Sequence, residues 1–123
     1  MKLILIVGIG GFIGSVSRYL LTLLVQNRFL STFPFGTLSV NILGCFLIGL
    51  VYALSERGNI GAEWRLFFIT GILGGFTTFS SFSNETVSML HDARYAYATL
   101  YVGCSVMAGI AATFGGVLLI KLL

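Results

Sequence analysis

One segment holds the side chains of this sequence that are best suited to binding ions. It reads Gly74-Gly75-Phe76-Thr77-Thr78-Phe79-Ser80-Ser81-Phe82-Ser83-Asn84-Glu85. Paired glycines and paired threonines are poor helix formers, and here they lie within a long apolar stretch. A helix that breaks deep in a membrane exposes backbone carbonyls that suit a small cation. An unbroken helix whose hydroxyls bond back to the preceding turn fits the same residues, so both alternatives stay open on composition alone.

Two phenylalanines in this segment could attract an anion. Phe79 and Phe82 are three residues apart, so they share a face if a helix resumes after the threonines. An aromatic ring has a positive edge, and edges turned inward attract negative charge. The hydroxyls of Thr78, Ser81 and Ser83 interleave with the rings. This mixture favours a polar track, and ordinary aromatic packing is the alternative.

Other polar residues lie inside apolar stretches. Arg18 and Glu85 are ionisable residues within these apolar stretches. Because charge is costly in lipid, such residues usually have a functional or interface role. Arg18 suits a vestibule that draws in anions, or a side chain that snorkels to the headgroups. Asn41, Tyr101 and Ser105 are expected to face inward, with a plain helix-to-helix hydrogen bond as the alternative for each.

Composition places the elements that carry these residues in a membrane. The chain has 123 residues, of which 57% are hydrophobic and only 9% charged, whereas soluble domains carry about 25% charged residues. The net charge of +3 comes from basic residues spread singly, which excludes a nucleic-acid patch. Cys45 and Cys104 lack metal-type or redox-type spacing, so they are interpreted as small buried apolar residues.

Four stretches are long enough to cross a bilayer, which takes roughly 20 mostly apolar residues. The predicted spans of this single domain, residues 1–123, are 3–25, 36–54, 65–90 and 95–120. An even number puts both termini on one side, together with Lys2, Arg57, Arg65 and Lys121, against Arg28 and Arg94 on the other. This weak bias is compatible with a single orientation and with insertion in both.

Glycines mark the faces on which these spans meet. Gly10 and Gly14 are four apart in the first span, and Gly71 and Gly75 repeat that spacing in the third. In lipid, small residues let helix backbones approach closely. Four helices of this size enclose little interior, so we expect a homo-oligomer to bury the polar positions.

Together these segments resemble the CrcB/Fluc family of fluoride channels. The likeness covers the whole chain and rests on the third-span segment above and on two further motifs, which are Gly10-Gly11-Phe12-Ile13-Gly14-Ser15-Val16-Ser17-Arg18 and Gly36-Thr37-Leu38-Ser39-Val40-Asn41. The third-span motif is highly specific, whereas the first-span glycines alone would be weak. Ser81 stands where the family often has threonine, and the hydroxyl is kept.

The resemblance implies an all-α membrane protein with a broken third span that assembles as an antiparallel, dual-topology homodimer. It implies passive, fluoride-specific export across the cell membrane, which protects the cell from fluoride. It further implies a structural sodium ion held by the main-chain carbonyls of Gly74 and Thr77. The residues it assigns to the fluoride path are Phe79, Phe82, Asn41, Ser81, Tyr101 and Ser105, while Arg18 and Glu85 receive a vestibule or interface role.

Two other classes of protein are compatible with four short spans. A small multidrug-type, proton-coupled exporter needs a membrane carboxylate, and Glu85 is the candidate, although such exporters carry theirs in the first span. A packing subunit of a larger complex would leave the hydroxyl-rich segment unexplained. An enzyme is not expected, because His91 is the lone histidine and no nucleophile–base pair is evident.

Overall fold

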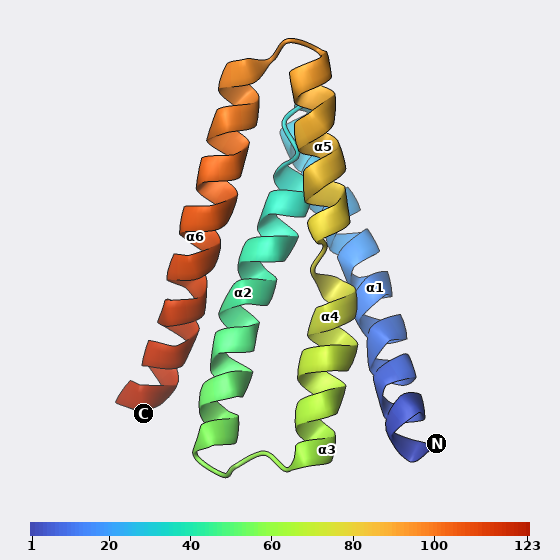
Figure 1. The fold of residues 1–123 in the computed structure, drawn as a ribbon, viewed down its shortest axis with the longest axis vertical. Helices are drawn as coiled ribbons and strands as arrows, with labels where there is room; N and C mark the ends of the chain where they lie inside the picture. Colours follow the sequence, from blue (N-terminus) through green and yellow to red (C-terminus); the bar gives the residue numbers. More distant parts are fainter.

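The computed structural model describes all residues, 1–123, and is entirely helical. Four helical segments are long and apolar enough to cross a membrane, which confirms the predicted number of spans. The third segment is built from several pieces (Figure 1). The elements are α1 (Lys2–Phe29), α2 (Phe35–Glu56), α3 (Ala62–Arg65), η1 (Leu66–Leu73), α4 (Gly74–Phe76), α5 (Phe79–His91) and α6 (Tyr95–Leu122).

The connections are short and tightly held. At the end of α1, Leu30 adopts a left-handed backbone with φ of 45°, which is strained for a residue that is not glycine. The Gln26 side chain then closes the loop: its Nε2 donates to the carbonyls of Ser31 at 2.6 Å and Phe33 at 3.1 Å. Its Oε1 accepts from the Gly36 N–H at 3.1 Å. One side chain thus fixes where α2 begins.

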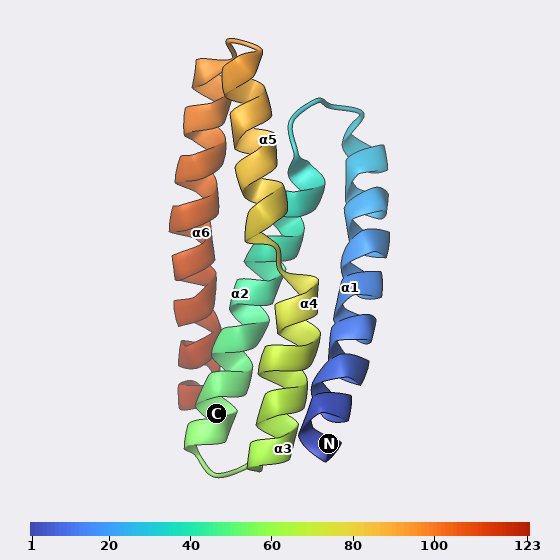
Figure 2. The ribbon, with the colours of Figure 1, turned by 45° about the vertical axis from the view of Figure 1, so that its right-hand side comes forward.

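The helices pack in two main groups, one formed by α2 and α6 and the other by α1 and the first half of the third segment. α2 packs mainly against α6, and α1 packs mainly against η1 and α4. Both termini lie at the same end, beside the connection between α2 and α3 (Figures 1 and 2). This placement agrees with an even number of spans.

Close backbone contact holds α1 against the third segment. A Cβ added to Gly10 would lie 2.8 Å from the Phe67 carbonyl oxygen and 2.9 Å from the Gly71 Cα. A Cβ on Gly14 would overlap the Ile72 carbonyl, and one on Gly75 would lie 2.6 Å from the Gly11 carbonyl oxygen. The two glycine pairs predicted to mark contact faces therefore meet each other.

The segment Leu66–Leu73 forms a π-helix, which the sequence analysis did not predict. This wider helix is rare, and usually occurs as single turns at functional sites. Here it includes Gly71, which faces Gly10, and it leads directly into the break. The extra width therefore lies where the third segment contacts α1.

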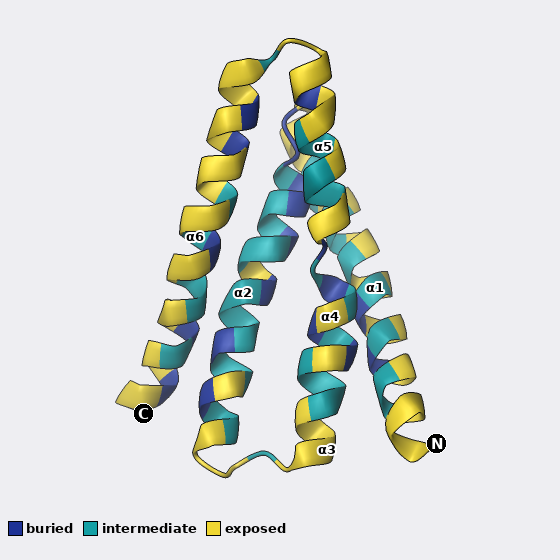
Figure 3. Ribbon diagram, viewed as in Figure 1, coloured by how far each residue is buried: buried dark blue, intermediate teal, exposed yellow.

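The single chain buries little of its surface. Only 20 of the 123 residues are buried, and exposed and intermediate residues run along all the long helices (Figure 3). The largest buried apolar cluster joins Phe33, Met89, Ala98 and Tyr101, at the end where α5 meets α6. The remaining apolar surface needs lipid or another protein surface to cover it.

Candidate functional site

The third segment is broken at two threonines, so of the two alternatives left open by composition the structure has the broken helix. Thr77 and Thr78 have extended backbones, with φ and ψ of −83° and 156° and of −149° and 114°. The Thr77 hydroxyl donates to the Leu73 carbonyl at 2.9 Å and helps to end the first half. The Thr78 hydroxyl accepts from the Ser81 N–H at 3.2 Å and caps α5.

Two carbonyls at the break are left without a donor. The Thr78 N–H, which would reach the Gly74 carbonyl in a continuous helix, donates instead to the Asn41 Oδ1 at 2.8 Å. None of the backbone hydrogen bonds outside the helices ends on the carbonyl of Gly74 or Thr77. Free carbonyl oxygens of an unwound membrane helix are suitable ligands for Na⁺, so these two residues fit the predicted cation site.

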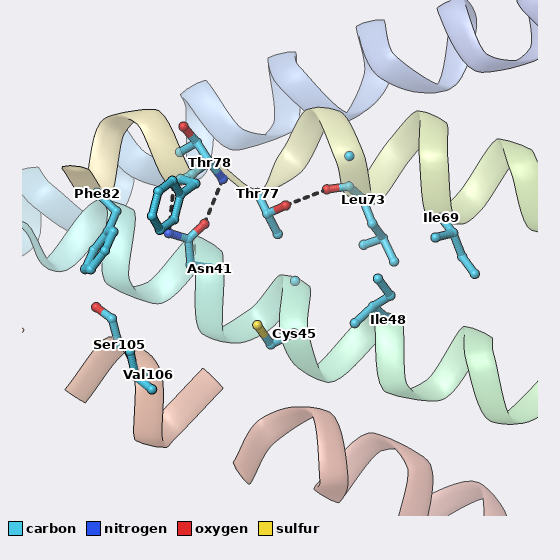
Figure 4. A pocket seen from close by; sticks show the side chains of 13 residues that line it. Asn41, Cys45, Ile48, Ile69, Leu73, Thr77, Thr78, Phe82, Ser105 and Val106 are labelled. Carbon is cyan, nitrogen blue, oxygen red and sulfur yellow. Dashed lines mark hydrogen bonds between the residues drawn. The ribbon is translucent and has the colours of Figure 1, made fainter. Parts of the chain in front are cut away.

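An open cavity of about 360 Å³ lies beside the break, between α2, the third segment and α6 (Figure 4). It brings together six of the predicted site residues: Asn41, Gly74, Thr77, Phe79, Phe82 and Ser105. The remaining lining residues are Gly44, Cys45, Ile48, Ile69, Leu73, Thr78 and Val106. The lining combines apolar side chains with a few polar groups, as small-ligand sites do.

The two phenylalanines stand together at this cavity. Their ring centroids are 5.5 Å apart with the planes tilted by 44°. Phe82 is half-buried and its ring also contacts Tyr101, at 5.2 Å between centroids. Phe79 is 78% exposed in the single chain. An aromatic ring so exposed beside a cavity indicates that something outside this chain covers it.

The carboxylate of Glu85 is held by two buried hydroxyls. The Thr37 hydroxyl donates to Oε1 and the Tyr101 hydroxyl donates to Oε2, each at 2.6 Å. Thr37 is 4% exposed and Tyr101 is fully buried. This group ties α5 to both α2 and α6, and it commits the Tyr101 hydroxyl, which was predicted to line the path, to a carboxylate.

A second, polar hollow of about 170 Å³ is lined in part by Glu85. Besides Glu85 its lining comes from the two connections at that end and from α5. These residues are Thr32, Pro34, Asn84, Ser88, Met89, Asp92 and Arg94. Glu85 therefore lines the polar hollow at this end of the bundle and does not line the cavity at the break.

The structure does not bring every predicted residue to the cavity. Ser81 lies in the first turn of α5, where its hydroxyl accepts from that of Thr78 at 3.2 Å. Arg18 is half-buried on α1 and makes no hydrogen bond or ion pair within the chain. Sequence reasoning gave no separate role to Thr37, although its position four residues before Asn41 on the same helix could have indicated an inward-facing hydroxyl.

Four segments able to cross a membrane, one of them broken beside a cavity lined by hydroxyls and two phenylalanine rings, define a small multi-span membrane protein with features of an ion pathway. The sequence model described as "CrcB-like protein, Camphor Resistance (CrcB)" matches residues 5–117. The chain belongs to this family.

Named relatives resemble the chain over nearly its whole length. A protein of Chlorobaculum tepidum is 48% identical over 124 residues, covering 99% of this chain and 97% of its own. A protein of Flavobacterium psychrophilum is 44% identical over 122 residues, covering 98% of both chains. One from Bacteroides fragilis is 45% identical over 119 residues, covering 94% of both. Each is named "Fluoride-specific ion channel FluC".

Proposed function

We propose that this chain is a fluoride-specific channel that lets fluoride leave the cell passively across the cell membrane. The observation that carries the proposal is the cavity at the broken third span, which is lined by Phe79, Phe82 and Ser105, in a chain 44–48% identical to proteins named as fluoride channels. Ring edges and hydroxyl protons together offer partial positive charge to a small anion.

The path proposed for fluoride runs along the face of α5. It begins at the cavity, with Asn41, Phe79, Phe82 and Ser105, and passes Ser81 at the start of the helix. Tyr101 supports it through its ring contact with Phe82 and its bond to Glu85. Arg18, which has no partner within the chain, is given a role at a vestibule or at an interface between chains.

An antiparallel, dual-topology homodimer is proposed as the working unit. Three features support it: the weak charge bias between the two faces, the small buried interior, and the exposure of Phe79 beside an open cavity. A second copy would cover the cavity and bring a second pair of Gly74 and Thr77 carbonyls. Four main-chain oxygens from two chains would hold a structural Na⁺, which supplies positive charge at the break.

A proton-coupled exporter fits the geometry less well. Such an exporter needs a carboxylate that is free to exchange protons with solvent and substrate, but the Glu85 carboxylate already accepts two hydrogen bonds of 2.6 Å. No other acidic residue lies within the spans, since Glu56, Glu63 and Asp92 belong to helix ends and connections.

The test is ion release from liposomes that contain the purified protein. Fluoride efflux, followed with a fluoride electrode, should require no proton gradient and should greatly exceed chloride efflux from matched vesicles. Protein-free liposomes set the background. Equal rates for the two anions, or a strict requirement for a proton gradient, would overturn the proposal.

A further inference from the structure

The Thr78 backbone and the Asn41 side chain are joined by two hydrogen bonds. The Thr78 N–H donates to Asn41 Oδ1 at 2.8 Å, and Asn41 Nδ2 donates to the Thr78 carbonyl at 3.1 Å (Figure 4). An extended residue presents its N–H and C=O to the same side, which is how paired residues of antiparallel strands exchange two bonds. An asparagine amide carries an acceptor and donors side by side, so one side chain takes the place of a neighbouring strand.

This pairing decides which backbone groups stay free at the break. While Asn41 holds the Thr78 N–H, that group cannot donate to the Gly74 carbonyl and the helix cannot close across the break. Thr78 is only 8% exposed, so water is a poor substitute partner for its N–H and carbonyl. Without the Asn41 amide, Thr78 must either stay unpaired or rewind into a helix.

We propose that Asn41 is a positioning residue that keeps the third span broken, and thereby keeps the Gly74 and Thr77 carbonyls available to a cation. This inference rests on the proposed function only where it assigns the two carbonyls to a bound cation. It gives Asn41 a role distinct from contact with the transported anion, since the amide oxygen and one of its two N–H groups are already engaged by Thr78.

The test compares wild-type protein with Asn41→Leu, which keeps the side-chain size and removes the amide. Nuclear magnetic resonance of isotope-labelled protein in micelles reports the hydrogen exchange and backbone shifts of Thr78. In the variant, Thr78 should exchange about ten-fold faster or more, the effect of losing one ordinary hydrogen bond, or should acquire helical backbone shifts. Fluoride flux should fall with it. The matched control is Ser39→Ala, which removes a polar group from the same helix and should leave Thr78 unchanged.

Unchanged exchange and unchanged extended-backbone shifts of Thr78 in Asn41→Leu would overturn the proposal, even if flux fell, because Asn41 would then act only on the ion. If Asn41→Leu does not fold, hydrogen exchange of the Asn41 side-chain amide is measured in the wild-type protein instead. One of its two protons should be protected from exchange, and free exchange of both would refute the pairing. These readouts need no transport. A wild-type protein that releases no fluoride would overturn the proposed function and leave this result standing.

Discussion

The contribution of the hydrogen bond from Tyr101 to Glu85 to the free energy of unfolding can be worked out from the surroundings of the two groups. Interhelical hydrogen bonds in bilayers average about 0.6 kcal/mol, whereas bonds to charged groups contribute about 1.5–3 kcal/mol. This bond is short, at 2.6 Å, and its donor is fully buried. In Tyr101→Phe the carboxylate keeps the bond from Thr37, so we expect the lower end of the range, a loss of about 1.5 kcal/mol.

The measurement is the free energy of unfolding in mixed micelles, titrated with denaturing detergent and followed by circular dichroism. Tyr97→Phe is the matched control: it lies one turn earlier on α6, is 49% exposed, and its hydroxyl makes no hydrogen bond. It should change stability by less than about 0.5 kcal/mol. Removing both donors, with Thr37→Val added, should cost more than the two single losses together, because the carboxylate then has neither.

A loss in Tyr101→Phe no larger than that of Tyr97→Phe would refute the reasoning. It would mean that the hydroxyl finds an equivalent partner in the unfolded state within the micelle, or that Glu85 does not hold the three helices together.

Three further predictions concern packing, the ion path and assembly. Gly14→Ala should destabilise the protein by about 1–3 kcal/mol in the same detergent titration, because the added methyl overlaps the Ile72 carbonyl. Gly8→Ala, which has open space around it, is the control and should be neutral or stabilising. Replacing Phe79 or Phe82 with isoleucine should abolish fluoride flux while the assembly still purifies intact, with Phe46→Ile near normal; normal flux in both variants would end the ring-edge mechanism. Reporters fused to the C-terminus should be found on both faces of the membrane, and adding lysines to one loop should reduce assembly; reporters on one face only would refute the antiparallel dimer.

Much of the fold could be predicted from local sequence. Apolar runs located the four crossing segments, and the glycine spacing identified the faces on which α1 and the third segment meet. The poor helix formers Thr77 and Thr78 indicated where a break was possible, and the backbone leaves the helix there. These features depend on residue type and spacing, which a single sequence displays.

The features that could not be predicted depend on how the helices are rotated against one another. Nothing in the residue types of Leu66–Leu73 distinguishes a π-helix from an α-helix, and the wider turn lies where this segment packs against α1. The hydrogen bond from the Tyr101 hydroxyl to Glu85 forms because α5 and α6 converge at their common end. The pairing of Asn41 with Thr78 joins residues 37 positions apart, a distance over which local patterns carry no information.

The break also separates charge along the third span. Peptide dipoles give the amino end of a helix about half a positive elementary charge and its carboxyl end about half a negative one. The half-helix before Thr77 ends in carbonyls, and α5 begins at Phe79 with N–H groups, so opposite partial charges stand at nearly the same depth, where water screens them poorly. The Na⁺ proposed at the carbonyl end would neutralise the negative member and leave the positive one at the start of α5. With that ion bound, the span would create a local electric field that favours an anion without an ionised side chain at that point.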